Sequence, residues 1–122
     1  MIKGIGTDLI EIGRVEKACK KEAFLARYFT YEEIAFMKGN ARKSAGNFAV
    51  KEAVSKVLGT GFSGFGPKDI EVLRDERGKP YVNLYGGAKK RADELHIKNM
   101  YVTISNTKEL VSAFAVGEDE SI

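Results

Sequence analysis

Two acidic residues, Asp8 and Glu52, stand where a carboxylate could do chemistry. Asp8 follows Gly4 and Gly6 at two-residue spacing in a segment rich in Ile and Leu, so these three residues share one face of a predicted strand. A carboxylate on an inner strand needs a cation or hydrogen-bond donors, because burying an unpaired charge is costly. Two carboxylates from separate elements could hold Mg²⁺, which leaves its other positions to water and phosphate.

Glu52 also has an ordinary structural explanation. It precedes Lys56 by four residues on a predicted helix, and this spacing is typical of a surface ion pair. The spacing alone does not bring Glu52 and Asp8 together. The residues alone therefore allow both interpretations of Glu52, as a metal ligand with Asp8 or as the partner of Lys56 in a helical ion pair.

Two further segments offer groups that could bind phosphate. Gly59-Thr-Gly61-Phe-Ser-Gly64 has the spacing of a dinucleotide fingerprint, but it follows a predicted helix rather than a strand, which excludes that reading. Its backbone amides could still form a phosphate nest, although a flexible connector is the simpler interpretation. Ser105-Asn106-Thr107-Lys108 offers hydroxyls, an amide and an ammonium group, and could either bind phosphate or form a turn.

The element that must position Glu52 is a predicted helix over residues 41–58. Its apolar residues recur at three- and four-residue spacing, and Gly59 suits a left-handed stop. This pattern predicts one core side and one polar side, with Glu52 on the polar side. It is the strongest helix prediction in the sequence.

A second helix is predicted from Gly13 onward. Its apolar stripe consists of Val15, Ala18, Cys19 and Ala23. A basic ridge flanks that stripe at three- and four-residue spacing, and it comprises Arg14, Lys17 and Lys21.

The remaining elements complete an α+β pattern. Thr30 to Glu33 has the spacing of a capping box and predicts a short helix that ends near Gly39. The other predicted elements are a strand over 2–10, a hairpin over 70–84 with its turn at 75–78, a short helix over 87–95, and strands over 100–105 and 110–116. We expect one compact domain over residues 1–122, with an antiparallel sheet, a long packed helix and a frayed acidic tail at 117–122.

Composition narrows the class of protein. A hydrophobic content of 43% with 30% charged residues fits a globule with a core. No uncharged apolar segment approaches the roughly 18–20 residues of a membrane-spanning helix, and we expect a cytoplasmic protein with no membrane partner. The single Cys19 and the single His96 exclude an internal disulfide and a four-ligand Cys/His zinc site. A net charge of +3 is too small to indicate nucleic acid, and an RNA-binding domain has little beyond a pI of about 8.9 in its favour.

Four segments taken together resemble the holo-[acyl-carrier-protein] synthases of the 4′-phosphopantetheinyl transferase superfamily. They are GIGTDLIEIGRV at 4–15, FAVKEAVSKVLGTG at 48–61, RGKPYVNL at 77–84 and VTISNTKELVSAFAV at 102–116. The resemblance implies a small α+β subunit, usually trimeric, with coenzyme A (CoA) bound in clefts between neighbours. It also implies transfer of phosphopantetheine from CoA to a serine of apo acyl carrier protein in fatty acid biosynthesis, with release of adenosine 3′,5′-bisphosphate.

The resemblance assigns roles to matching residues. Asp8 and Glu52 would hold Mg²⁺ against the CoA diphosphate, and Glu52 or a water on the metal would accept the serine proton. Lys56 would neutralise phosphate charge, while Gly59 and Gly61 would let the backbone approach the nucleotide. Lys108 is a further candidate phosphate contact. The basic ridge of Arg14, Lys17 and Lys21 would dock the acidic recognition helix of the carrier protein.

Two positions depart from the family pattern. Asn106 stands where the family commonly has His, and Asn47 where it often has Arg, and both are candidate contacts of CoA phosphates. Restoring either cation is expected to strengthen CoA binding. A relative that binds CoA or carrier protein without turnover is the alternative function, but the retention of Asp8 and Glu52 argues against it.

Overall fold

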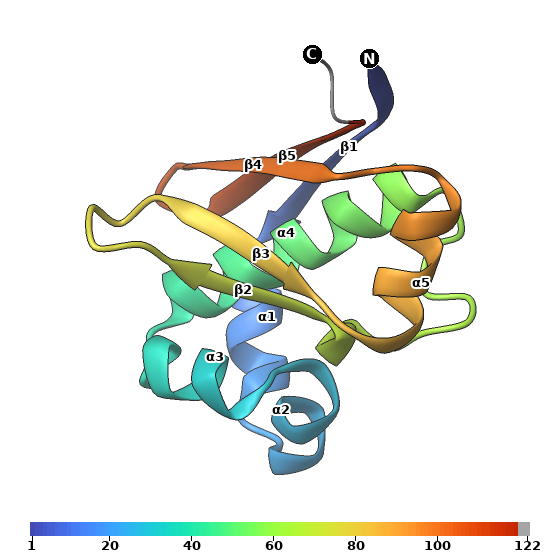
Figure 1. Cartoon of the computed structure of the whole chain (residues 1–122). Helices are drawn as coiled ribbons and strands as arrows, with labels where there is room; N and C mark the ends of the chain where they lie inside the picture. Colours follow the sequence, from blue (N-terminus) through green and yellow to red (C-terminus); the bar gives the residue numbers. More distant parts are fainter. Residues whose placement is uncertain (120–122) are drawn as a thin grey trace.

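The computed structural model describes residues 1–119, and Figure 1 shows the arrangement of its elements. In chain order they are β1 (Ile2–Glu11), α1 (Ile12–Cys19), α2 (Glu22–Tyr28), α3 (Tyr31–Met37), α4 (Ala41–Leu58), the 3₁₀ turn η1 (Pro67–Asp69), β2 (Ile70–Arg74), β3 (Pro80–Leu84), α5 (Gly86–Glu94), β4 (Asn99–Asn106) and β5 (Leu110–Glu118). The strands form two antiparallel sheets, one in the order β1-β5-β4 and one of β2 and β3. The predicted α+β class is confirmed.

Helix α4 is the centre of the core. It packs on β1 and β5 of the larger sheet, on β2 of the hairpin, and on α1 and α3 (Figure 1). Its predicted bounds are confirmed, and it ends at Gly59, whose φ of 76° gives the expected left-handed stop. The expected polar side is wrong, because four polar residues on α4 are buried, namely Ser44, Asn47, Lys51 and Ser55. Because other elements pack on almost every side of α4, few of its residues are exposed to solvent.

The glycines of β1 allow the strand to approach α4 very closely. A Cβ atom at Gly4 would lie 2.7 Å from the carbonyl oxygen of Val57, and one at Gly6 would overlap the carbonyl group of Ala53. Any side chain at these two positions would push strand and helix apart. The glycine face of β1 is therefore the inner face, and Asp8 lies on it.

The opposite face of the larger sheet is apolar and exposed. Ile5 and Leu9 alternate with the inner residues of β1 and are 60% and 66% exposed. Phe114 lies opposite Thr7 in the neighbouring β5, and its side chain is 43% exposed. Tyr101 of β4 and Leu110 of β5 are also exposed. We call Ile5, Leu9, Tyr101, Leu110 and Phe114 the outer apolar face.

The helix predicted from Gly13 is two helices. Helix α1 ends at Cys19, and α2 begins at Glu22 after a short turn. Ala23 belongs to α2 and is exposed, so it is not part of the expected apolar stripe. Lys21 precedes α2 as its N-cap residue, and the basic ridge therefore spans a helix boundary.

The predicted capping box and hairpin turn are confirmed, and the predicted tail is wrong in part. Thr30 and Glu33 form both hydrogen bonds of the capping box at the start of α3. The hairpin turns at Asp75, whose Oδ1 accepts hydrogen bonds from the amides of Arg77 and Lys79. The frayed tail expected from residue 117 is wrong at its start, because Gly117 and Glu118 belong to β5 and the carboxylate of Asp119 binds the N-terminal ammonium. Residues 120–122 of that tail lie outside the described residues.

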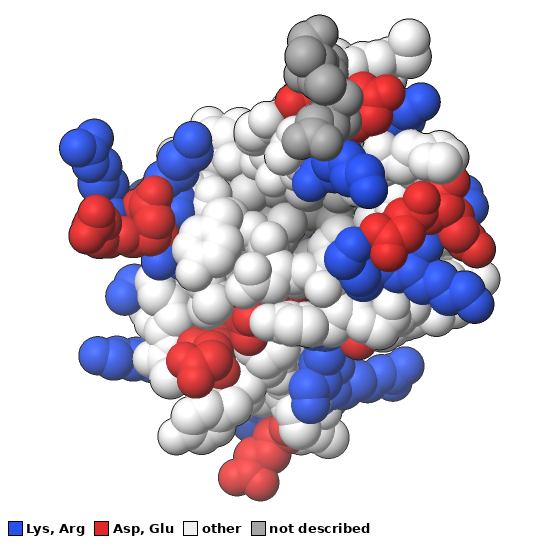
Figure 2. Space-filling view, viewed as in Figure 1, with Lys and Arg blue, Asp and Glu red and all other residues white. Residues whose placement is uncertain are grey.

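Within residues 1–119, no helix combines the length and the apolar character needed to cross a membrane. Charged side chains of both signs lie around the rim of the face shown in Figure 2, and the centre of that face is mostly uncharged.

Candidate active site

Asp8 and Glu52 lie close together where β1 crosses α4. The packing of Gly6 on Ala53 places the next inner residue of β1, Asp8, beside the helical turn that carries Glu52 and Lys56. The electrostatic effect of Asp8 reaches Glu52, because the Asp8 charge contributes to the raised pKa of the Glu52 carboxyl. The structure thus joins two residues that are 44 positions apart in the sequence.

Lys56 turns toward the strand. Its ammonium group donates a hydrogen bond of 2.7 Å to the backbone oxygen of Thr7 and lies 3.5 Å from Oδ1 of Asp8. The helical ion pair with Glu52, which the spacing had left open, is not among the salt bridges of the described residues. Because 54% of its side chain is exposed, Lys56 remains accessible to an anionic ligand.

The carboxylate of Asp8 has unused binding capacity. Its Oδ2 atom is buried and finds no hydrogen-bond partner within the described residues. A buried carboxylate oxygen without a donor is costly, and a cation would offset that cost. One such oxygen beside a second carboxylate is the oxygen-rich, incomplete donor set that suits Mg²⁺.

Two effects raise the pKa of Glu52. Burial of its carboxyl is the larger cause, the charge of Asp8 adds to it, and the ammonium group of Lys56 opposes both. Like charges that repel in this way indicate a pocket that favours an additional cation.

The candidate phosphate loop follows α4 directly. Gly59 ends the helix and Gly61 has a φ of 60°, so both take conformations that favour glycine. No described atom lies within 4 Å of the position a Cβ would take at Gly61. The backbone here is open to a ligand, on the same end of α4 as Lys56.

Asn106 lies in a different place from the carboxylates. It lines a cavity of about 450 Å³ near the start of α4, together with Arg42, Lys43 and Arg74. Arg74 and Lys43 both stack on the ring of Phe36, at 4.7 and 4.9 Å from its centroid. Gly46 in this cavity precedes Lys56 by ten residues, which is about 15 Å along a helix.

Asn47 does not reach any ligand site. Its side chain is fully buried, and its amide nitrogen donates hydrogen bonds to Oε2 of Glu33 at 3.1 Å and to the backbone oxygen of Val72 at 2.9 Å. The expectation that Asn47 contacts a CoA phosphate is therefore wrong. Replacing it by Arg would force a longer cation into this packed polar cluster.

Arg14 of the basic ridge borders an apolar pocket of about 260 Å³. Its aromatic wall contains Phe24, Tyr28 and Phe48, with the rings of Tyr28 and Phe48 stacked at 5.3 Å. The pocket adjoins the carboxylates, because the Glu52 charge contributes to the raised pKa of Tyr28, second to burial. Arg14, Lys17 and Lys21 are exposed, and Lys108 is exposed between β4 and β5.

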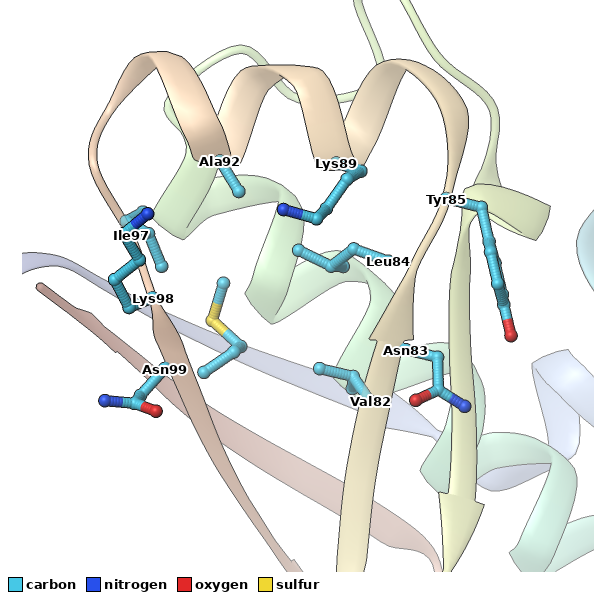
Figure 3. A pocket seen from close by; sticks show the side chains of 10 residues that line it. Val82, Asn83, Leu84, Tyr85, Lys89, Ala92, Ile97, Lys98 and Asn99 are labelled. Carbon is cyan, nitrogen blue, oxygen red and sulfur yellow. The ribbon is translucent and has the colours of Figure 1, made fainter. Parts of the chain in front are cut away.

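The sequence did not point to the cations of the cavity that Asn106 lines. Arg74 and Lys43 carry no motif, and their shared contact with Phe36 joins residues far apart in the chain. It also gave no indication of a cavity of about 410 Å³ between β3, α5 and β4, lined by Lys89 and Met100 among others (Figure 3). None of the predicted site residues lines that cavity.

Comparisons with known proteins identify the family of the chain. Residues 4–115 match the model of a family described as the 4′-phosphopantetheinyl transferase superfamily. The chain is 56% identical to a holo-[acyl-carrier-protein] synthase of Lachnoclostridium phytofermentans, covering 97% of each chain, and 53% identical to one of Clostridium beijerinckii, covering 97% and 98%.

Solved structures show the same fold. A Helicobacter pylori holo-[acyl-carrier-protein] synthase in complex with coenzyme A has a TM-score of 0.85 at 32% identity, covering 93% of this chain and 99% of that one. The Bacillus anthracis synthase, in complex with CoA (3′,5′-ADP), has a TM-score of 0.82 at 36% identity, covering 98% and 99%. These likenesses confirm the single α+β domain with its long central helix.

Proposed function

The chain belongs to the 4′-phosphopantetheinyl transferase superfamily, and on that premise we propose how its own residues carry the reaction. As a holo-[acyl-carrier-protein] synthase, it transfers 4′-phosphopantetheine from CoA to a serine of apo acyl carrier protein in fatty acid biosynthesis. The observation that supports the proposed site most directly is the buried Asp8 oxygen without a partner, beside Glu52 on the adjoining helix.

Asp8 and Glu52 would hold Mg²⁺. When bound, the metal neutralises phosphate charge and polarises the phosphoryl group that is transferred. The two carboxylates come from elements locked together by the glycine packing of β1 on α4, so they offer a rigid pair of oxygen donors.

Lys56 and the open loop would bind the CoA diphosphate. The Lys56 ammonium is fixed near Asp8 by the Thr7 carbonyl yet is half exposed, so it can face a phosphate. The backbone at Gly59 and Gly61 has no side chain to prevent close approach.

Glu52 is the proton acceptor in this proposal. The serine oxygen of the carrier attacks the phosphorus that bears pantetheine, and the bond from that phosphorus to the adenosine 3′,5′-bisphosphate oxygen breaks. Glu52 takes the serine proton as the new phosphorus–oxygen bond forms.

Mass spectrometry of apo carrier protein incubated with the chain, CoA and Mg²⁺ tests the function. We expect the carrier to gain the mass of one phosphopantetheine group, and we expect chelation or Asp8→Ala to abolish that gain, because the metal then lacks a ligand. Glu32→Ala is the matched control, since it removes an exposed carboxylate on α3.

Full transfer by Asp8→Ala would refute the metal assignment. Binding of CoA or carrier protein by the wild-type chain without any gain in carrier mass would establish the alternative, a binding module that has lost turnover.

The basic ridge and the apolar pocket beside it would dock the carrier protein. Arg14 stands at the junction, because it is an exposed cation and also lines the pocket. An amphipathic helix with an acidic edge fits this combination, since its acidic residues would meet Arg14, Lys17 and Lys21 while an apolar side chain enters the pocket.

Charge reversal at Arg14 tests this docking. We expect Arg14→Glu to raise the KM for the carrier by about ten-fold or more and the KM for CoA by less than about two-fold, because steering of an acidic partner is lost. Added salt should reproduce the effect on the wild type. Lys98→Glu, which reverses an exposed charge directly before β4, is the control. Equal changes in both constants would contradict carrier docking at Arg14.

We further propose that three copies assemble through the outer apolar face. Single exposed apolar side chains are common on protein surfaces, but here five large ones share one sheet surface. Such a patch is typical of an interface between identical subunits. Assembly would also bring further cations to the site, because neither Asp8 nor Glu52 lines the cationic cavity with Asn106 in its own subunit. A neighbour could bring that cavity, with Arg74 and Lys43, to the nucleotide phosphates.

Sedimentation equilibrium tests the assembly. We expect a species of three times the 13.4 kDa chain mass, and Leu9→Lys should yield monomers without transfer activity, because a buried lysine would be unpaired. Lys3→Leu on the same strand serves as a control for altered charge. A monomeric wild type whose specific activity is constant on dilution would overturn the proposal.

A further inference from the structure

Two cationic side chains hold the two ends of the loop over residues 59–66. At its start, Nε of Arg91 in α5 donates a hydrogen bond of 3.0 Å to the backbone oxygen of Leu58. At its end, Nζ of Lys51 in α4 donates to the backbone oxygens of Pro67 at 3.0 Å and Ile70 at 2.5 Å. Neither residue belongs to the loop, and neither has a role in the reaction described above.

Lys51 is an unusual residue for this task. Its side chain is fully buried, and its third bond goes to Oε1 of Glu33 at 2.7 Å. A buried lysine costs free energy, and its burial lowers the pKa of the ammonium group, with Glu33 opposing that change. An apolar residue of similar size would fill the same space at less cost, so the cation is retained for the groups that it binds.

Helix α5 lies beside the loop (Figure 1) and contacts it at its start and in its far part. Arg91 lies beside Gly59, with Nη2 4.0 Å from the position of a Cβ there. Gly87, one turn earlier in α5, packs so closely that a Cβ atom would lie 2.8 Å from the Cβ of Phe65. The helix therefore fixes both the first residue of the loop and its far part.

The middle of the loop is held by its two aromatic side chains. Phe62 and Phe65 pack against the hydrophobic core, and their ring centroids lie 5.8 Å apart. Gly61 and Gly64 have positive φ values, and within the described residues no atom lies within 4 Å of a Cβ placed at either. The backbone at Gly61 is free to adopt many conformations, so its position depends on how the residues on either side of it are held.

We propose that Arg91 and Lys51 are positioning residues for CoA, which set the loop so that its backbone meets the nucleotide. This inference rests on the proposed role of Gly59 and Gly61. The two residues act on the position of the loop and do not contact the phosphates. A displacement of the loop backbone by about 1 Å is enough to weaken CoA binding and transfer markedly.

Arg91→Met tests the first residue, with Lys90→Met as the matched control. Both remove a cation from α5, but Lys90 is exposed and its side chain makes no hydrogen bond within the described residues. We expect Arg91→Met to raise the KM for CoA about three- to ten-fold, since one charge-assisted hydrogen bond is lost, and to change the KM for the carrier by less than about two-fold. Lys90→Met should change neither constant.

Amide hydrogen exchange of the free protein separates positioning from direct contact. Without CoA, the amides of residues 60–66 should exchange faster in Arg91→Met than in the wild type and in Lys90→Met. An increased KM with unchanged exchange would mean that Arg91 touches a phosphate directly. Unchanged KM and unchanged exchange would also overturn the proposal.

Lys51 is tested by removing both charges of the pair. The variant Lys51→Met with Glu33→Leu leaves no unpaired buried charge, so we expect it to remain folded in a thermal melt and to show the same rise in CoA KM and loop exchange. A folded variant without these changes would exclude Lys51 from positioning. If the double variant does not fold, Arg91→Met decides the proposal alone. Wild-type chain that modifies no carrier would refute the proposed function, while the exchange comparison would still report on the loop.

Discussion

The close contact between β1 and α4 is the constraint on which the site depends. Gly4 and Gly6 have no side chain, so the strand lies directly against the carbonyl groups of Val57 and Ala53. Asp8, the next residue on that face, is thereby held beside the turn of α4 that carries Glu52 and Lys56. A larger residue at Gly6 would separate strand and helix and would remove the site without altering any of its charged residues.

The rotation of α4 about its axis is fixed by a second set of contacts. Asn47 and Lys51, one turn apart, both bind Glu33, and Lys51 also binds the segment that leads into β2. Phe48 comes directly after Asn47, Glu52 comes directly after Lys51, and Lys56 lies one turn beyond Glu52. The contacts that fix Asn47 and Lys51 therefore also direct Phe48, Glu52 and Lys56 toward β1 and the aromatic pocket. The buried polar cluster and the candidate site lie on two faces of one helix.

Residues with local signals were predictable from the sequence. The glycine spacing of β1, the bounds of α4 and the capping box at Thr30 depend on near neighbours in the chain, and all three are as expected. Asp8 and Glu52 stood out from their residue types and positions, and the resemblance to a known family suggested the roles of Asp8, Glu52 and Lys56. The predictions that failed concern features that depend on tertiary contacts. Asn47 carries no sign of its burial against Glu33, and no Gly or Pro marks the break between α1 and α2 after Cys19. The contact of Arg74 with Phe36 likewise joins elements whose pairing no local pattern encodes.

The most direct test of the account is the titration of Glu52 in the metal-free protein, followed by carbon NMR of its carboxyl group. The account predicts a pKa above the ordinary glutamate value, and Asp8→Asn should lower it, because one of its two causes is then removed. Since a raised pKa means that the folded state binds more protons than the unfolded chain, stability should fall as the pH rises from the ordinary value through the raised one, and less so in the variant. An unchanged Glu52 pKa in Asp8→Asn would show that the carboxylates do not share a site.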